Sequence, residues 1–230
     1  VPVVTSNTSS LPEVSQGAAL EVDPLSVADI SSAMQSLVED QFLRRRCIVA
    51  YPSETFYGLA VDPRRDDAVA RLYAAKGRDA SMAIPLIAAS LAQAEEAAVV
   101  GDRERRLARA FWPGPLTIVM PPRAAIAART LGDGPTVALR VPSHVVARAL
   151  AARFGFCITA TSANRSGEPP ASDAEEVAER FSGSDLVDFL LDGGPTPGGP
   201  PSTIVEMVRT GPRCVRAGAV AWDRVLRSLE

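Results

Sequence analysis

Histidine and lysine are almost absent from the chain. One histidine, His144, and one lysine, Lys76, occur in 230 residues, so all the other members of the 24 Lys and Arg residues are arginine. The single histidine excludes metal sites built from several imidazoles, and any Ser-His or Cys-His catalysis would need His144 itself. Lys76 has two interpretations: a position that requires a compact ammonium with three rotatable donors, or an ordinary solvated helix end.

Cysteine is also scarce. Cys47, Cys157 and Cys214 lie far apart, are odd in number and form no C-x-x-C pair. This pattern excludes a disulfide framework and a thiolate zinc site, and it favours a reducing compartment, so we expect a cytoplasmic protein. The Asp and Glu residues lack the spacing of a calcium loop, and we therefore expect no metal site formed by the protein itself.

Long hydrophobic runs are missing as well. No apolar stretch approaches the roughly 20 residues that a membrane-spanning helix needs, because Arg, Gly or Pro interrupts the longest ones. We therefore expect a soluble protein with no membrane partner. The 27 acidic residues against 24 basic ones give a formal net charge of -3, which disfavours a dedicated nucleic-acid binder. With 47% hydrophobic residues, the chain can build a large core.

Short strands and helices alternate along most of the chain. Residues 1–20, rich in Ser, Thr, Pro and Gly, predict a flexible tail, and residues 21–230 a single folded domain. Helices are predicted from Asp23-Pro24 to the basic run at 44–46, and at 66–75, 90–99, 102–110, 143–154, 172–181 and 222–229. Strands are predicted at 47–51, 84–88, 116–120, 136–141, 156–161 and 186–191, with a hairpin of residues 202–208 and 213–216. This alternation predicts an α/β fold with a twisted mixed β-sheet flanked by helices.

Polar loops follow several predicted strands, which is where α/β folds place ligands. These loops supply hydroxyl groups, one amide, one ammonium and several guanidinium groups, a set that binds phosphate and carboxylate. The chain has no Walker motif, and no G-x-G-x-x-G follows a strand, so a standard P-loop or Rossmann nucleotide site is disfavoured. The glycine-rich residues 192–201 contain prolines, which remove the amides that a phosphate cradle would need.

Six short motifs occur in an order and spacing that resemble the YrdC-type threonylcarbamoyl-AMP synthases. They are PSETFYGL at 52–59, KGR at 76–78, FWPGPLT at 111–117, VALRVP at 137–142, SANRSG at 162–167 and DGG at 192–194. One such motif alone would carry no weight, but the ordered set, over about residues 25 to 220, is highly specific. The resemblance implies a YrdC-like catalytic domain over residues 21–230 with a large, positively lined cavity.

The activity implied by the resemblance is that of a nucleotidyltransferase. L-threonine, bicarbonate and ATP, the last with Mg²⁺, would give L-threonylcarbamoyl-AMP and pyrophosphate. The product would feed a separate tRNA threonylcarbamoyltransferase complex that modifies the adenosine next to the anticodon, and direct contact with tRNA is left open. Attack on the α-phosphate builds negative charge, which Lys76 and the arginines are suited to stabilise, and no covalent nucleophile is required.

The resemblance also implies a role for individual residues. It assigns catalysis to Lys76 and Arg78. The threonine side is implied to consist of Thr55, Arg140, Ser162 and Ser202. The nucleotide side is implied to consist of Arg78, Thr136, Asn164, Ser172 and Arg216.

The chain departs from the family pattern in one segment. Met82 stands where many relatives have a basic or amide residue, and apolar residues 84–88 replace a strand that often contains histidine, so substrate contacts from this segment are an open question. Two other functions stay open: an RNA-binding or ribosome-associated module, and a carbamoyl-transfer enzyme related to the YrdC-like domain of hydrogenase maturation factors. RNA binding without ATP consumption would indicate the first, and activity with carbamoyl phosphate but not threonine the second.

Overall fold

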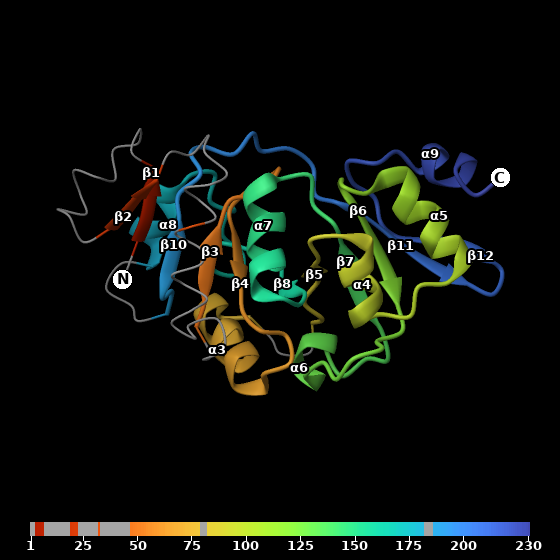
Figure 1. Ribbon diagram of the computed structural model, residues 1–230, viewed down its shortest axis with the longest axis horizontal. Coiled ribbons are helices and arrows are strands. Elements are labelled where there is room, and N and C mark those ends of the chain that lie inside the picture. Colours follow the sequence, from red (N-terminus) through yellow and green to blue (C-terminus); the bar gives the residue numbers. More distant parts are fainter. Residues whose placement is uncertain (1–2, 7–18, 23–31, 33–46, 79–81, 182–185) are drawn as a thin grey trace.

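The strands form two six-stranded sheets that lie side by side along the long axis of the molecule (Figure 1). This computed structural model describes residues 3–6, 19–22, 32, 47–78, 82–181 and 186–230. Sheet A contains, in spatial order, β2 (Ala19–Val22), β1 (Val3–Ser6), β10 (Phe189–Leu191), β3 (Val49–Tyr51), β4 (Gly58–Ala60) and β9 (Thr161–Ser162). Sheet B contains β12 (Gly211–Arg216), β11 (Thr203–Val208), β6 (Leu116–Met120), β7 (Val137–Arg140), β5 (Leu86–Ile87) and β8 (Ile158–Thr159).

Both sheets are mixed. In sheet A, β10 and β3 are parallel, whereas β3 and β4 are antiparallel. In sheet B, β11 and β6 are parallel, whereas β6 and β7 are antiparallel. The helices are α3 (Asp66–Lys76), α4 (Leu91–Ala97), α5 (Asp102–Phe111), α6 (Ala128–Leu131), α7 (Val145–Phe154), α8 (Ala174–Phe181) and α9 (Trp222–Arg227).

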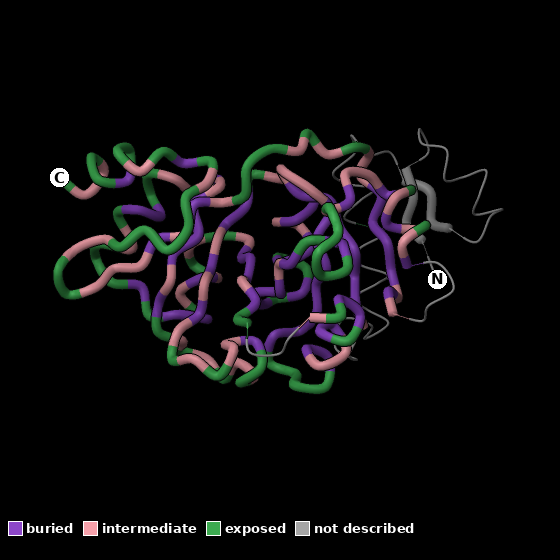
Figure 2. The backbone as a smooth tube through the Cα atoms, turned by 180° about the vertical axis from the view of Figure 1, so that it is seen from behind, coloured by how far each residue is buried: buried purple, intermediate pink, exposed green. Residues whose placement is uncertain are grey.

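Alternating side chains of β3 belong to two hydrophobic cores. Val49 and Tyr51 lie in a core shared with α4, α5, α7 and sheet B, whereas Ala50 and the preceding Ile48 lie in a core with α3 and α8. This alternation follows from the two-residue period of a strand, whose successive side chains point to opposite faces. Helices therefore cover both faces of sheet A, and Figure 2 shows its central strands buried.

One short segment passes from one sheet to the other. Thr159 ends β8 in sheet B, and Thr161 begins β9 in sheet A. The backbone N–H of Val61 donates to Oγ1 of Thr159 at 2.9 Å, and the Tyr51 hydroxyl donates to the Thr159 carbonyl at 3.5 Å. These bonds hold the two sheets at a fixed place relative to each other.

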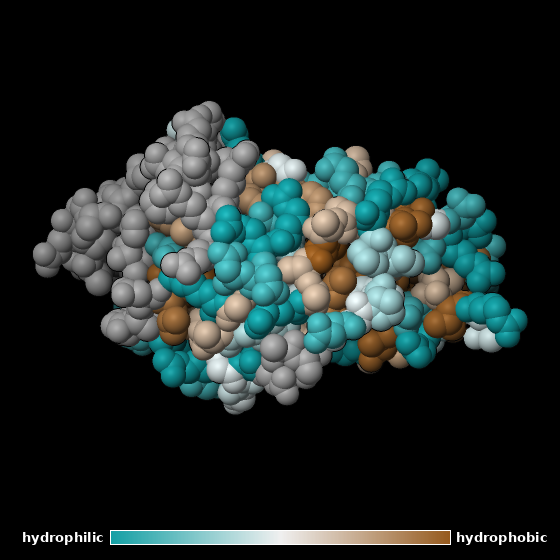
Figure 3. Space-filling model, turned by 90° about the horizontal axis from the view of Figure 1, so that it is seen from below, coloured by the Kyte–Doolittle hydropathy of each residue, from teal (hydrophilic) through white to brown (hydrophobic). Residues whose placement is uncertain are grey.

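Exposed large apolar side chains are few. Among the described residues they are Met82, Val99, Val145, Val215 and Leu226. Figure 3 shows the hydrophobic residues of one face as small patches among hydrophilic ones. In the described part of the chain, no helix has both the length and the apolar character needed to cross a bilayer.

The predicted α/β fold with mixed strands and flanking helices is confirmed, but the strands divide between two sheets instead of one. The strand predicted at 156–161 is accordingly split into β8 and β9. Within residues 1–20, predicted as a flexible tail, residues 3–6 form β1 and residues 19–20 begin β2, and the rest of that range lies outside the described residues. The helix predicted from Asp23 also lies outside them, except for Ser32, which is helical.

Candidate functional site

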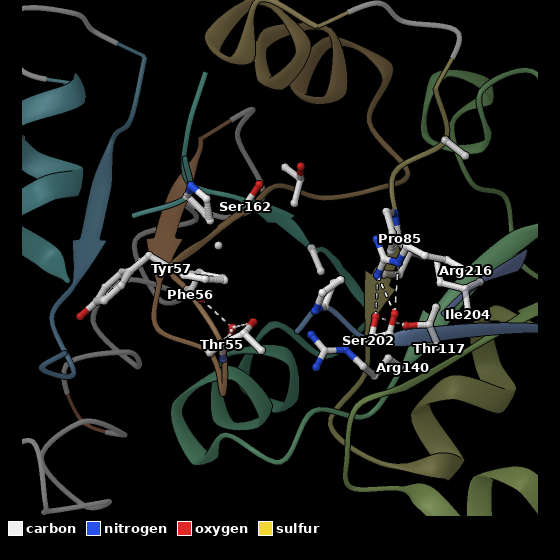
Figure 4. Close-up of a pocket in the computed structure, with 18 of the residues that line it drawn as sticks. Thr55, Phe56, Tyr57, Pro85, Thr117, Arg140, Ser162, Ser202, Ile204 and Arg216 are labelled. Atoms are coloured by element: carbon white, nitrogen blue, oxygen red, sulfur yellow. Dashed lines mark hydrogen bonds between the residues drawn. The ribbon is translucent and has the colours of Figure 1, made fainter. Parts of the chain in front are cut away.

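A cavity of about 600 Å³ lies where the two sheets meet. Figure 4 shows Thr55 and Ser162 on the wall built from sheet A, opposite Arg140, Ser202 and Arg216 on the wall built from sheet B. Its lining, drawn from the described residues, includes Arg78, Arg140 and Arg216 but no Asp or Glu. Three arginines and no described carboxylate therefore line this cavity.

The turn between β3 and β4 presents Thr55 to the cavity. The Ser53 hydroxyl donates to the carbonyl of Phe56 at 2.6 Å and accepts from the N–H of Thr55 at 3.3 Å. Gly58, just after the turn, lies opposite Tyr51 in the ladder, and a Cβ at residue 58 would lie 2.9 Å from a carbon of the Tyr51 ring. Side-chain hydrogen bonds and a required glycine thus fix this wall.

Arg140 ends β7 and enters the cavity from sheet B. Its Nη1 pairs with the carboxylate of Glu54, which belongs to the β3–β4 turn on the opposite wall, and these side chains are 14% and 15% exposed. Burial lowers the pKa of Arg140, and Arg216 nearby adds to this effect. The Glu54 carboxylate lies against the guanidinium, so the positive charge of Arg140 is balanced by a negative one.

Ser202 and Arg216 form a second polar group on the sheet B wall. Nη2 of Arg216 donates to the Ser202 carbonyl at 2.8 Å and to its hydroxyl at 3.0 Å. The Ser202 hydroxyl also shares a hydrogen bond with the hydroxyl of Thr117 at 2.8 Å. Burial lowers the pKa of Arg216 from its ordinary value. Among the described residues, Arg216 has no carboxylate partner, so its charge is available to an anion.

Arg78 reaches the cavity because α3 ends immediately before it. Gly77 caps α3 in the left-handed conformation with φ of 56°, which glycine adopts at little cost. The chain then turns so that Arg78 lines the cavity, where its Nη2 donates a long bond of 3.4 Å to the carbonyl of Ala83. No carboxylate pairs with Arg78 within the described residues.

Lys76 lies beneath the cavity wall and does not line it. Its ammonium donates to the carbonyls of Ser162 and Asn164 at 2.5 and 2.9 Å and to Oδ1 of Asn164 at 3.2 Å. Burial lowers its pKa to about 8, and the nearby Arg78 adds to the shift. The ammonium is therefore the main form at pH 7, and it holds the turn that presents Ser162 to the cavity.

The other predicted nucleotide-side residues lie away from the cavity lining. Asn164 is buried and accepts from Lys76, and its amide donates to the Glu168 carbonyl at 2.7 Å. Ser172 bonds to Glu176 of α8 and does not reach the cavity. Thr136 precedes β7, at the opposite end of that strand from Arg140. Direct nucleotide contacts of Asn164, Ser172 and Thr136 stay predictions.

The glycine-rich loop is tied to the β3–β4 turn. The Tyr57 hydroxyl donates to the carbonyl of Gly194 at 2.9 Å and accepts from the N–H of Gly193 at 3.1 Å. Burial and the nearby Asp192 carboxylate raise the pKa of Tyr57, so the hydroxyl keeps its proton. A Cβ at residue 193 would lie 2.7 Å from Pro52, which explains the glycine there.

The sequence alone assigned no substrate contact to Glu54 or Thr117, and it indicated only a place in the cavity wall or core for Tyr57. Each belongs to one of the six motifs, so a signal existed, but no local pattern showed that Glu54 would meet Arg140 across the two sheets. In the described ranges, no group of three or more His, Cys, Asp and Glu side chains could hold a metal ion.

Comparison with known proteins finds one family profile and similar proteins that share one name. The sequence profile of the Sua5, YciO and YrdC proteins, described as "Telomere recombination", matches residues 41–218. The threonylcarbamoyl-AMP synthase of Chromohalobacter salexigens is 40% identical over 72% of this chain and 88% of its own length. That of Pyrococcus abyssi is 36% identical over 80% of this chain and 54% of its own length, so the chain spans about half of that relative.

The same relationship appears in three dimensions. The crystal structure of Pyrococcus abyssi Sua5 in complex with L-threonine matches with a TM-score of 0.78 and 34% identity, covering 86% of this chain and 57% of that one. The family predicted from the six motifs is thereby confirmed. Because the profile covers more than half of the sequence and a relative of similar length is well above 30% identical, the chain belongs to the Sua5/YciO/YrdC family.

Proposed function

We propose that the protein is an L-threonylcarbamoyl-AMP synthase, which joins L-threonine, bicarbonate and ATP and releases pyrophosphate. The observation that carries the proposal is the convergence of three arginines with several hydroxyl groups in one cavity; the arginines are Arg78, Arg140 and Arg216. The names of the similar proteins, and the L-threonine complex of one of them, support this proposal.

The cavity chemistry matches reactants that are anionic or contain a carboxylate. Arginine binds carboxylate and phosphate through parallel N–H groups, and its charge is held at any working pH. A volume of about 600 Å³ is in the range of sites for nucleotide-sized ligands. In this proposal Arg140, Thr55, Ser162 and Ser202 bind the amino acid, and Arg78 and Arg216 bind the phosphates.

The proposed reaction depends on positioning and charge. The threonine amine joins bicarbonate to give a carbamate with loss of water. A carbamate oxygen then forms the new bond to the α-phosphorus, and the bond to pyrophosphate breaks. Negative charge on the phosphate oxygens is stabilised by the guanidinium groups of Arg78 and Arg216. Lys76 holds residues 162–164 in place through one hydrogen bond to Ser162 and two to Asn164, and adds positive potential from below the wall. No side chain forms a covalent intermediate.

Mg²⁺ enters this proposal together with ATP. The cavity lining offers hydroxyl groups but no carboxylate within the described residues, which fits an ion carried by the triphosphate better than an ion held by the protein. When present, the ion would neutralise charge on the phosphates. The further proposals are that the product passes to a tRNA threonylcarbamoyltransferase complex and that the protein acts in the cytoplasm.

The proposal is tested by pyrophosphate release from ATP and bicarbonate, with and without L-threonine. We expect release to depend on threonine and to fall at least about tenfold in Lys76→Ala, equivalent to about 1.4 kcal/mol of barrier. The matched control is Arg109→Ala, which removes an exposed cation on α5 and should leave the rate unchanged. Release that is independent of threonine in folded protein would contradict the proposal.

A further inference from the structure

The arginines that line the cavity differ in whether a carboxylate side chain forms an ion pair with them. Arg140 pairs with Glu54, whereas Arg78 and Arg216 have no carboxylate partner in the described part of the chain. Both carboxylate oxygens of Glu54 are buried, and no described residue donates a hydrogen bond to them, so Arg140 is the partner that balances their charge. The charge of Arg140 is thus balanced, whereas Arg78 and Arg216 each bring an unbalanced positive charge to the cavity.

Glu54 pairs with Arg140 outside the cavity lining, so its negative charge acts on a bound ligand electrostatically and without direct contact. Arg140 lines the cavity, but Glu54 does not. Arg140 meets Glu54 through its Nη1, and within the described residues no hydrogen bond of the Arg140 guanidinium competes with a bound carboxylate. Both side chains are largely buried, where Coulomb interactions are screened less than at the surface.

We infer that Glu54 is a specificity-determining residue that directs a zwitterionic amino acid to Arg140 and keeps polyanions at Arg78 and Arg216. A zwitterion is attracted by both members of the pair, because its carboxylate binds Arg140 and its ammonium is attracted by the negative charge of Glu54. A ligand that carries only negative charge is attracted by Arg140 and repelled by Glu54. This inference rests on the proposed function, which requires an amino acid and a nucleotide triphosphate to occupy one cavity without exchanging places.

The inference is tested by calorimetric binding of two ligands that differ only in the amino group. These are L-threonine and 2,3-dihydroxybutanoate, in which a hydroxyl replaces the ammonium. In Glu54→Gln we expect the affinity for the anion relative to threonine to rise at least about tenfold, because the repulsive charge is removed. Any displacement of Arg140 affects both carboxylates alike and cancels in this ratio.

Two further variants separate charge from shape. Glu54→Asp keeps the charge, so the affinity ratio should stay near that of the wild type even where both ligands bind more weakly. Glu96→Gln removes an exposed carboxylate on α4, away from the cavity lining, and should leave the ratio unchanged. An unchanged ratio in folded Glu54→Gln would overturn the inference.

A measurement on the wild type keeps the inference testable if Glu54→Gln does not fold. Saturating pyrophosphate should leave the dissociation constant of L-threonine within about twofold, because the two ligands occupy differently charged parts of the cavity. Competition between pyrophosphate and threonine would overturn the inference but leave the proposed function intact. A wild-type protein that fails to bind L-threonine would contradict the proposed function and this inference with it.

Discussion

Lys76 is the one lysine of the chain, and its ammonium lies against three oxygen atoms of residues 162–164. The interpretation of a solvated helix end is wrong, because the side chain is buried. A guanidinium is planar and could not aim three N–H groups at three acceptors around a single nitrogen. Ammonium geometry therefore gives a physical reason for lysine at this position.

The first prediction concerns the titration of Lys76. Because burial and Arg78 lower its pKa, the midpoint should lie near 8 and not near 10.5. The chain has one lysine, so protein labelled with ¹⁵N-lysine gives a single side-chain signal to follow by NMR. In Arg78→Gln the midpoint should rise, because a like charge is removed. A wild-type midpoint near 10.5 would contradict the burial of the ammonium.

The same shift has a consequence for stability. The folded chain releases the Lys76 proton near pH 8, whereas the unfolded chain keeps it to about pH 10.5. The unfolded state binds more protons in that window, so this group makes the unfolding free energy rise with pH between the two values. Unfolding free energies are measured against pH for the wild type and for Lys76→Met, and the difference between the two curves isolates this contribution.

The pair of Glu54 and Arg140 gives a second prediction. Arg140→Gln leaves a buried carboxylate without its partner, which should cost about 3 to 5 kcal/mol of unfolding free energy. Adding Glu54→Gln should recover much of that loss, because the uncompensated charge is then removed. Urea denaturation of the two single variants and the double variant measures both effects. Strictly additive losses would show that the two side chains do not interact.

At the scale of elements, β3 and β4 shape the cavity wall through one close packing contact. Tyr51 and Gly58 face each other across the antiparallel ladder, and there is no room for a Cβ at residue 58. Gly58→Ala should therefore destabilise the fold by about 1 to 3 kcal/mol, as overpacking does. Gly101→Ala is the control, because its Cβ would meet only the flexible end of Glu104. Equal thermal stability of both variants would contradict this packing.

Most helices and strands could be predicted from the sequence because the spacing of their hydrophobic residues is a local pattern. The helix predicted at 66–75 is α3, with Gly77 as its cap, and the strand predicted at 116–120 is β6 with the same bounds. The strand β4 was missed, because its three residues follow a polar loop and carry no alternation of their own. The split of residues 156–161 was also missed, because which sheet a two-residue strand joins depends on distant partners.

At the scale of the whole molecule, the cavity exists because two sheets meet. Ser162 and the β3–β4 turn with Thr55 belong to the sheet A side, whereas Arg140, Arg216 and Ser202, which precedes β11, belong to the sheet B side. The family resemblance implied these residues, although Ser202 and Arg216 lie outside the six motifs, and it did not imply the contact between Glu54 and Arg140. Contacts between side chains of different sheets join residues far apart in the chain, and the local spacing of hydrophobic residues does not predict them. The charge pattern of the cavity is therefore a property of the assembled fold.

The most direct test of the proposed function is the mass of the product made from ¹³C-labelled bicarbonate, L-threonine and ATP. If the carbamoyl carbon comes from bicarbonate, the threonylcarbamoyl-AMP ion should be one mass unit heavier than with unlabelled bicarbonate, and omission of threonine should abolish it. The Arg140→Gln variant, if folded, should form much less product at the same threonine concentration. Conversion of ATP with no labelled threonylcarbamoyl-AMP would contradict the function proposed for this cavity.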